Sequence, residues 1–318
     1  MNKARIQDKM KEAIACYSDA FVTIPQRGDA FNRLGNTLNS QGEHEVALAA
    51  FEQALAINPD HAGAYSNLGN TLNALGRTEE AAWAYFSSLQ KDPGNSTARH
   101  MFSALTGQPS DRPPTKYIKD LFDQYANRFD FHLVNRLRYQ VPARLFRVVK
   151  RVCGESTRFE NVVDLGCGTG LAGMFFKQMS KHIIGVDLSG KMLEKAGEKK
   201  IYHELIQREL VHYLSSTDRK FDLFVAADVF AYVGELSELF TKVRDCSQAG
   251  ACMAFSTEKC MGKDFKLRSA GRYAHSRGYI ETLADEHGFK VESCSAVDVR
   301  RESHRWVSGD LFVLKSLA

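Results

Sequence analysis

The pattern of apolar and polar positions changes near residue 160. Before that point apolar residues recur three and four positions apart, which indicates amphipathic helices. After it, short β-branched runs alternate with helical stretches, and this alternation predicts a parallel α/β sheet with right-handed crossovers. The runs are 161–165, 182–189, 202–206, 221–228 and 251–256. Two later runs, 289–299 and 309–316, have no helix between them, so we expect them to pair antiparallel.

The helical part contains an internal repeat with a period of 34 residues. The stretch from Phe31 to Asp60 aligns without a gap with the stretch from Tyr65 to Gly94. Its small residues, Gly35 and Ala47, are expected to let two antiparallel helices approach closely. Large apolar residues fill the space between the helices, and a glycine suits the turn. The remaining positions of the pattern are Phe31, Leu34, Leu38, Gly42, Phe51 and Pro59. This pattern resembles the tetratricopeptide repeat.

An earlier partial copy adds to this array. Its residues precede their counterparts by 34 positions and are Ala13, Tyr17, Ala20 and Pro25. The array is therefore about two and a half repeats over residues 5–95. We place an all-α repeat domain at 1–104, a proline-rich linker at 105–116 and the α/β domain at 117–318. The repeats offer either a surface for a protein partner or a structural cap, and the sequence leaves this open.

The segment 117–152 predicts two or three amphipathic helices with a break before Pro142. It is rich in aromatic residues. Most of them are expected in the core, but helices that precede a nucleotide-binding sheet commonly form its lid. We therefore expect Tyr125 and Phe129 to cover a cofactor.

The run Val162–Gly170 holds an acid and three glycines at alternating positions, Asp164, Gly166, Gly168 and Gly170. It resembles the glycine motif of class I S-adenosylmethionine-dependent methyltransferases. The resemblance implies a Rossmann-like seven-stranded sheet with the last strand antiparallel, and S-adenosyl-L-methionine as cofactor. A loop without side chains admits the methionine part of the cofactor, and Asp164 attracts its ammonium group directly or through water. The same glycines also fit a dinucleotide fingerprint, but the acid favours a ligand with an ammonium group over a pyrophosphate.

Further cofactor contacts follow at the ends of the next strands. Asp187 is expected to accept both ribose hydroxyls, with Leu188 beside it, although an ordinary helix cap is the alternative. The resemblance places Glu209 near the adenine amino group and the Leu210 amide near a ring nitrogen; a solvated acid at a helix start is the alternative. Asp228 ends the fourth strand near the reactive end of the cofactor, together with Tyr232. Residues 117–318 as a whole resemble a group of predicted bacterial methyltransferases that carry tetratricopeptide repeats.

The acceptor side is expected after the fifth strand. We predict that the segment 272–276 is a loop near the carboxyl edge of the sheet, with Arg272, Tyr273 and His275 facing the acceptor. His275 titrates near neutrality and is the preferred general base, with a structural histidine as the alternative. Tyr232 and Asp228 are the other catalytic candidates. Arg272 and Arg300 suit a carboxylate or phosphate because a guanidinium makes bidentate contacts.

Composition narrows the function classes. The chain has 318 residues, a formal net charge of +4 and seven cysteines without a C-x-x-C pair. The spread-out charge argues against nucleic-acid binding, and the cysteine spacing indicates no metal site. The sequence has no apolar run long enough to suggest a membrane span. Its amphipathic N-terminus does not look like a secretory signal, so we expect a cytoplasmic protein. The leading hypothesis is methylation of a small molecule. The alternatives are methylation of a protein docked by the repeats, and an adaptor that binds the cofactor without chemistry.

Overall fold

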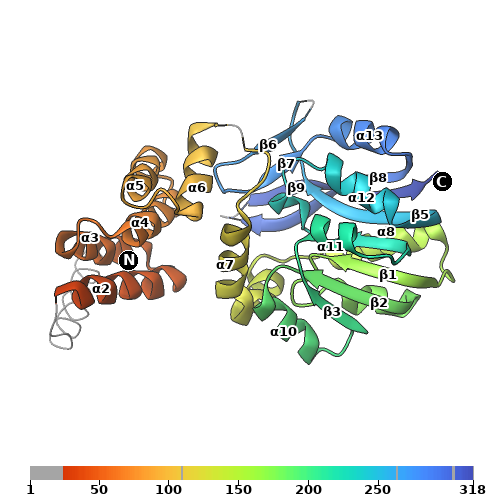
Figure 1. Ribbon diagram of the computed structural model, residues 1–318, viewed down its shortest axis with the longest axis horizontal. Helices are drawn as coiled ribbons and strands as arrows, with labels where there is room; N and C mark the ends of the chain where they lie inside the picture. The colour runs from red at the N-terminus through yellow and green to blue at the C-terminus, as the bar shows by residue number, and fades with distance from the viewer. Residues whose placement is uncertain (1–23, 109, 263, 303–304, 318) are drawn as a thin grey trace. The chain divides into compact units, whose positions relative to one another are not determined.

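The computed structural model describes residues 24–108, 110–262, 264–302 and 305–317 (Figure 1). The chain divides into two units by its internal contacts. The first comprises 1–110 with 268–271, and the second comprises 111–267 and 272–318. The division at residue 110 falls inside the linker expected at 105–116. The partial repeat expected around Ala13, Tyr17 and Ala20 lies outside the described residues.

The first unit consists of helix pairs built from the 34-residue repeat. Its helices are α2 (Ile24–Ser40), α3 (His44–Ile57), α4 (Ala62–Ala74), α5 (Thr78–Lys91) and α6 (Ser96–Thr106). A Cβ atom placed on Gly35 would lie 2.5 Å from the Phe51 ring, and one on Gly69 would lie 2.8 Å from the Tyr85 ring. Both rings are fully buried. The small residue of each repeat is therefore needed for the close packing of its two helices.

The second unit is built on a seven-stranded sheet (Figure 1). The strands are β1 (Phe159–Leu165), β2 (Ser180–Asp187), β3 (Glu204–Gln207), β4 (Phe221–Ala226), β5 (Ser247–Glu258), β8 (Phe289–Glu302) and β9 (Arg305–Ser316). Their order is β3-β2-β1-β4-β5-β9-β8, and within this sheet β9 alone runs in the direction opposite to the other strands. The predicted sheet is confirmed. The order reverses between β1 and β4, and a parallel sheet offers a ligand crevice at such a point.

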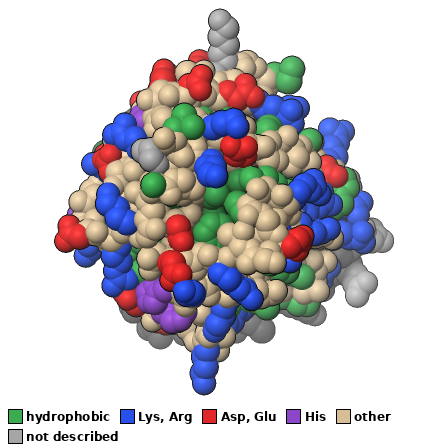
Figure 2. Space-filling view, turned by 90° about the vertical axis from the view of Figure 1, so that its right-hand side faces the viewer, with side chains coloured by type: hydrophobic (Ala, Val, Ile, Leu, Met, Phe, Trp, Pro, Cys, Tyr) green, Lys and Arg blue, Asp and Glu red, His purple; other side chains and the backbone are tan. Residues whose placement is uncertain are grey.

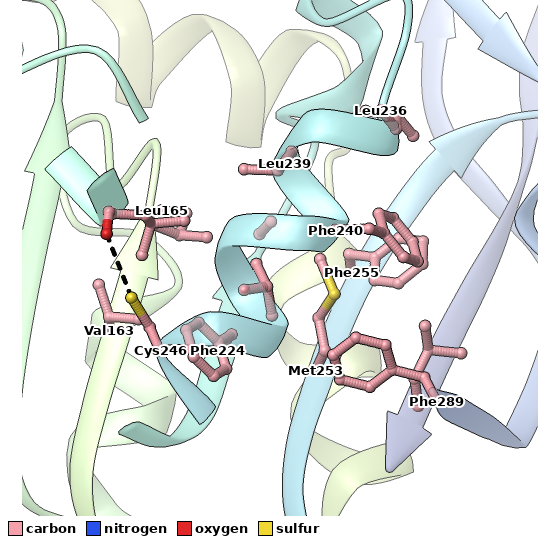
Figure 3. Close-up of a cluster of buried hydrophobic side chains, with 14 of the residues drawn as sticks. Val163, Leu165, Phe224, Leu236, Leu239, Phe240, Cys246, Met253, Phe255 and Phe289 are labelled. Atoms are coloured by element: carbon pink, nitrogen blue, oxygen red, sulfur yellow. Dashed lines mark hydrogen bonds between the residues drawn. The ribbon is translucent and has the colours of Figure 1, made fainter. Parts of the chain in front are cut away.

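Helices cover both faces of the sheet and bury an apolar core on each. These helices are α8 (Val141–Cys153), α9 (Gly173–Phe176), α10 (Gly190–Glu198), α11 (Leu210–Ser216), α12 (Ser237–Asp245) and α13 (Arg277–Glu286), with short turns η3 (Lys177–Met179) and η4 (Phe230–Tyr232). One core packs Phe240 of α12 against Phe255 of β5 and Phe289 of β8 (Figure 3). The other packs Leu145 and Val149 of α8 against the opposite face. Both faces of the central strands are buried, as their continuous apolar runs require.

The segment before β1 forms the expected helices. It comprises α7 (Thr115–Tyr125), a 3-10 turn η1 (Ala126–Arg128) and a π-helical turn η2 (Phe131–Arg136), and α8 follows with Pro142 in its first turn. We refer to residues 115–136 as the lid segment. No helix in the described part of the chain is long and apolar enough to cross a membrane. Charged side chains of both signs are spread over the face shown in Figure 2, with apolar side chains visible near its centre.

The structure corrects the prediction of a loop at 272–276. Tyr273–His275 is strand β7, which pairs antiparallel with β6 (Phe265–Leu267) in a separate two-stranded sheet. All three residues of β7 are buried. Each of these strands has only three residues, which is too short for an alternating pattern to be recognised in the sequence.

Candidate cofactor and acceptor site

The glycine loop follows β1 and depends on the absence of side chains. Gly166 has φ of +67° and Gly168 has φ of +53°, values that favour glycine. A Cβ atom on Gly166 would also lie 2.7 Å from Cγ2 of Val229. The first glycine of the motif therefore lets the segment after β4 pack directly against the loop.

Asp187 ties the glycine loop to the end of β2. Its Oδ2 accepts a hydrogen bond of 2.8 Å from the Gly168 amide, and its Oδ1 accepts one of 2.8 Å from the Ser189 amide. Burial raises the pKa of this carboxyl, while these backbone donors lower it. Each carboxylate oxygen can accept a second hydrogen bond, so the group retains the capacity to bind ribose hydroxyls. Leu188 follows directly and is half-buried.

Asp164 lies at the end of β1 and is only 1% exposed. Its Oδ2 accepts a hydrogen bond of 2.6 Å from the phenol of Tyr202. Burial raises the pKa of Asp164 to about 7, the Tyr202 hydrogen bond opposes this rise, and the charge of Asp187 adds to it. Tyr202 was not among the residues expected at the site from the sequence. The contact of Asp164 with a ligand ammonium stays a prediction.

The lid segment lies against the glycine loop. The ring of Phe129 comes within 3.9 Å of the Cβ position of Gly168. Tyr125 packs edge-on against Phe129 at 5.2 Å, and burial raises the pKa of its phenol to about 12. Two lid carboxylates, Asp123 and Asp130, bind the loops of the site, and neither was foreseen. The only sequence signal for them is their spacing of seven residues in the stretch FDQYANRFDFHL.

Glu209 is a solvated acid at a helix start, which was the alternative to an adenine contact. It is the N-cap of α11, and its Oε2 accepts a hydrogen bond of 2.8 Å from the His212 amide. The side chain is exposed, and Leu210 begins the helix half-buried. An adenine contact by these two residues stays a prediction.

Five charged side chains form a cluster at the carboxyl ends of β4 and β5: Asp228, Glu258, Arg272, Arg300 and Glu302. Nη1 of Arg300 lies 2.8–2.9 Å from both oxygens of Asp228, and its Nε donates to Glu302 at 2.6 Å. Its Nη2 donates to Glu258. Arg272 joins the same two glutamates, with 2.8 Å to Glu258 and 2.6 Å to Glu302.

This acid–arginine cluster changes the role expected of the arginines. All three nitrogens of the Arg300 guanidinium are engaged by carboxylates, and Arg300 is only 3% exposed. It therefore offers no free fork for an anionic acceptor, contrary to our expectation. Burial raises the pKa of Asp228 and the charge of Arg300 opposes this rise. Burial acts to raise the pKa of Glu302 as well, but the charges of Arg300 and Arg272 hold that pKa below its usual value.

Tyr232 lies in η4, directly after β4. Its ring packs edge-on against Phe122 of the lid segment at 4.9 Å. Burial raises the pKa of the phenol, which is therefore a neutral hydrogen-bond donor at physiological pH. The backbone at Asp228 has φ of +61°, an unusual value for a residue with a side chain, and its amide donates to Ser256 Oγ at 2.8 Å. Strain of this kind is found mostly at functional sites.

His275 does not face an open site as expected. It is fully buried on β7, and its Nε2 lies 2.8 Å from the carbonyl oxygen of Gly234. Its ring stacks on Tyr279 at 5.9 Å. Burial lowers its pKa to about 4, so the ring is neutral and Nε2 donates the hydrogen bond. Tyr273 is also fully buried and packs against Gly234. The structure therefore favours a structural role for His275, which was the alternative to a general base. It gives no support to an acceptor contact by Tyr273.

Two parts of the chain match known family models. Residues 162–250 match the family model of the methyltransferase domain, and residues 32–96 match that of the tetratricopeptide repeat. The first match contains the glycine loop, Asp187, Glu209 and Asp228. The chain thus carries a methyltransferase domain behind tetratricopeptide repeats, which confirms the resemblance seen in the sequence.

Two curated relatives are similar to part of the chain. A malonyl-[acyl-carrier protein] O-methyltransferase of Hamiltonella defensa is 29% identical over 96 residues, 30% of this chain and 37% of that protein. The enzyme of the same name from Salmonella typhimurium is 23% identical over 137 residues, 42% of this chain and 54% of that protein. The chain thus spans about half or less of the length of these relatives.

Solved structures of similar shape include two methyltransferases. Magnesium protoporphyrin IX methyltransferase from Synechocystis PCC 6803 with bound S-adenosylmethionine is 15% identical, with a TM-score of 0.48 over 64% of this chain and 96% of that one. N-methyltransferase NodS from Bradyrhizobium japonicum WM9 in complex with S-adenosyl-L-homocysteine is 16% identical, with a TM-score of 0.47 over 62% of this chain and 100% of that one.

Proposed function

We propose that this protein transfers a methyl group from S-adenosyl-L-methionine to a small-molecule acceptor. The observation that carries the proposal is the meeting of three strand ends at one edge of the sheet. β2, β1 and β4 are neighbours, so Asp187, the glycine loop and Asp228 lie side by side. The hydrogen bond from Gly168 to Asp187 joins the first two directly. The match to the methyltransferase family covers all three.

The residues present fit this cofactor. Around the Cβ position of Gly168 the nearest heavy atom is in the Phe129 ring at 3.9 Å, and Asp187 has free acceptor capacity for two ribose hydroxyls. Asp164 and Asp187 supply negative charge for a ligand that carries an ammonium and a sulfonium. Tyr125, Leu188, Glu209 and Leu210 complete the proposed surroundings. When bound, the cofactor supplies a methyl group that is already activated on sulfur.

The acceptor end lies at Asp228 and Tyr232. The acid–arginine cluster holds three carboxylates against two guanidiniums, and both arginines are engaged within it. This balance favours a neutral or cationic acceptor over a carboxylate or phosphate. The neutral phenol of Tyr232 donates a hydrogen bond that orients the nucleophile. Positioning of this kind supplies about 7–11 kcal/mol of barrier reduction in favourable systems, so a strong base is not required.

An acceptor attached to a protein is the second candidate. Two observations favour it: the tetratricopeptide match at residues 32–96, and the curated relatives whose names specify an acyl-carrier protein. Repeats of this type commonly bind a peptide or protein. A cofactor-binding adaptor without chemistry is disfavoured because the glycine loop, Asp187 and Asp228 are all present.

Calorimetry with S-adenosylmethionine and S-adenosylhomocysteine tests the cofactor assignment. The parent protein is expected to bind both, Asp187→Ala to bind weakly, and Glu194→Ala, which removes an exposed acid of α10, to bind like the parent. Labelled cofactor is then supplied with a metabolite extract and, separately, with a protein extract. Label in the metabolite fraction supports the proposal, and label confined to protein supports the second candidate. Absence of cofactor binding by the parent refutes both.

A further inference from the structure

The lid segment contributes two carboxylates that reach the loops of the cofactor site. The first is Asp123 in α7. Its Oδ1 accepts a hydrogen bond of 2.5 Å from the Ser189 hydroxyl and lies 3.5 Å from the Lys191 amide. Ser189 is the buried N-cap of α10, two residues beyond Asp187. Asp123 therefore holds the lid helix to the loop that carries the ribose acid.

The second carboxylate, Asp130, joins three segments at once. Its Oδ1 accepts a hydrogen bond from the hydroxyl of Thr169, which lies within the glycine motif and is 1% exposed. Its Oδ2 binds Nζ of Lys199 at 2.6 Å, and the same ammonium group donates to the Thr169 carbonyl at 2.5 Å. The lid, the glycine loop and the end of α10 are thus connected through one carboxylate.

These contacts form a continuous path of hydrogen bonds around the proposed cofactor position. The path runs from Asp123 to Ser189, and Asp187 accepts the Ser189 amide and the Gly168 amide at 2.8 Å each. Thr169 then follows Gly168 and binds Asp130. Tyr125 and Phe129 lie between the two acids in the lid. The lid is therefore fixed at two points to the loops that we assign to the cofactor.

We propose that Asp130, paired with Lys199, is a positioning residue that fastens the lid to the glycine loop and controls the release of S-adenosylmethionine. Asp123 is the second fastening point. The inference rests on the proposed function, because it names the residues that retain the cofactor. The ligand leaves only after these bonds break, so weakening them speeds dissociation. Each hydrogen bond to a charged group contributes about 1.5–3 kcal/mol, which corresponds to about 10–100-fold in a rate or an equilibrium.

The first experiment measures cofactor release from the full chain. Labelled S-adenosylmethionine is bound and then chased with excess unlabelled cofactor. Asp130→Asn keeps the size of the side chain but removes the charge that binds Lys199, and we expect about ten-fold faster release with little change in association. Asp120→Asn is the matched control. It lies in α7 of the same lid segment, half-buried, and has no hydrogen-bonding partner among the described residues, so its release rate is expected to match the parent.

Lys199→Met tests the other partner of the pair. We expect release to be as fast as in Asp130→Asn, and the double variant to be little faster than either single one, because both remove the same interaction. Hydrogen exchange without cofactor supplies a readout that is independent of ligand binding. The amides of residues 115–136 are expected to exchange faster in Asp130→Asn, while those of β1 and β4 keep their parental protection.

Any of three results would overturn the inference: parental release rates in both single variants, additive effects in the double variant, or faster hydrogen exchange across the whole sheet. A parent protein that binds S-adenosylmethionine but shows any of these results leaves the proposed function standing. A parent that does not bind S-adenosylmethionine overturns the proposed function and the inference together.

Discussion

Arg300 balances three carboxylates at the proposed acceptor end of the site, and its replacement by Met tests that balance directly. Arg300→Met leaves Asp228, Glu258 and Glu302 with Arg272 alone. Removing one partner of a buried ion pair costs about 3–5 kcal/mol because a charge is left buried without compensation. Glu302 is 30% exposed, so solvent screens its interaction with Arg300 and the loss of that pair costs little. Glu258 is 1% exposed, so its charge would stay buried without compensation.

The stability change is measurable in one domain. Of the two tryptophans, Trp306 lies on β9 and Trp83 lies in α5, so a Trp83→Phe background lets fluorescence follow the α/β unit alone. Urea unfolding at pH 7.5 is expected to give a loss of about 3–5 kcal/mol. In thermal unfolding this corresponds to about 6–20 °C for a unit of this size. Arg301→Met, the next residue on β8, is the matched control, and its effect is expected to stay within about 0.5 kcal/mol.

Acidic pH supplies the sharper test. Burial raises the pKa of Asp228 and the charge of Arg300 opposes this rise, so without Arg300 the folded-state pKa of Asp228 rises further above its unfolded value. Protonation then removes the uncompensated charge, so the loss relative to the parent is expected to shrink as the pH falls from 7.5 towards 5. The reasoning is refuted if Arg300→Met behaves like Arg301→Met at pH 7.5, or if its relative loss grows in acid.

Three further predictions concern the titrating groups and the ribose acid. Asp187→Ala is expected to lose about 1.5–3 kcal/mol of S-adenosylmethionine affinity, measured by calorimetry, and unchanged affinity would remove the ribose assignment. Asp164 has a pKa of about 7, so cofactor affinity is expected to rise as the pH increases through 7, with proton release on binding. Calorimetry in two buffers of different ionisation enthalpy measures that release, and a pH dependence retained in Asp164→Asn would assign it elsewhere. His275 has a folded pKa of about 4 against 6.5 for the free side chain, so the folded state loses stability as the pH falls from 6.5 to 4, by up to about 3 kcal/mol. His275→Phe is expected to abolish this dependence of the urea midpoint, and an unchanged slope would place the titrating group elsewhere.

Features that depend on local spacing were predictable from the sequence. The 34-residue period required the helix pairs, because Gly35 and Phe51 meet only if two helices pack closely. The alternation of β-branched runs with helical stretches indicated the sheet and its antiparallel last strand. Asp187 was correctly expected to end the strand one crossover after the glycine motif, and its ribose contact stays a prediction. In each case neighbouring residues carry the information.

The placement of His275 shows where such reasoning fails. Its neighbours Arg272 and Tyr273 suggested a polar loop, yet Gly234, 41 positions earlier in the chain, supplies the carbonyl that binds the ring. The strands β6 and β7 are too short to leave a pattern, so the burial of His275 became visible only when the hairpin was folded against the sheet. Burial by distant segments then lowers its pKa and removes it from acid–base chemistry.

The sequence by itself determined the repeats, the order along the chain of the strands of the main sheet, and the glycine loop, because these follow from periodicity and from backbone conformations that only glycine adopts readily. Tertiary structure alone decided which charges face one another. Arg300 lies 72 positions from Asp228 and 42 from Glu258, and Asp130 lies 39 from Thr169 and 69 from Lys199. Charge pairing acts through space and leaves no periodic trace along the chain. The partners within the acid–arginine cluster, and those of the lid segment, are therefore fixed by the packing of the sheet and its helices.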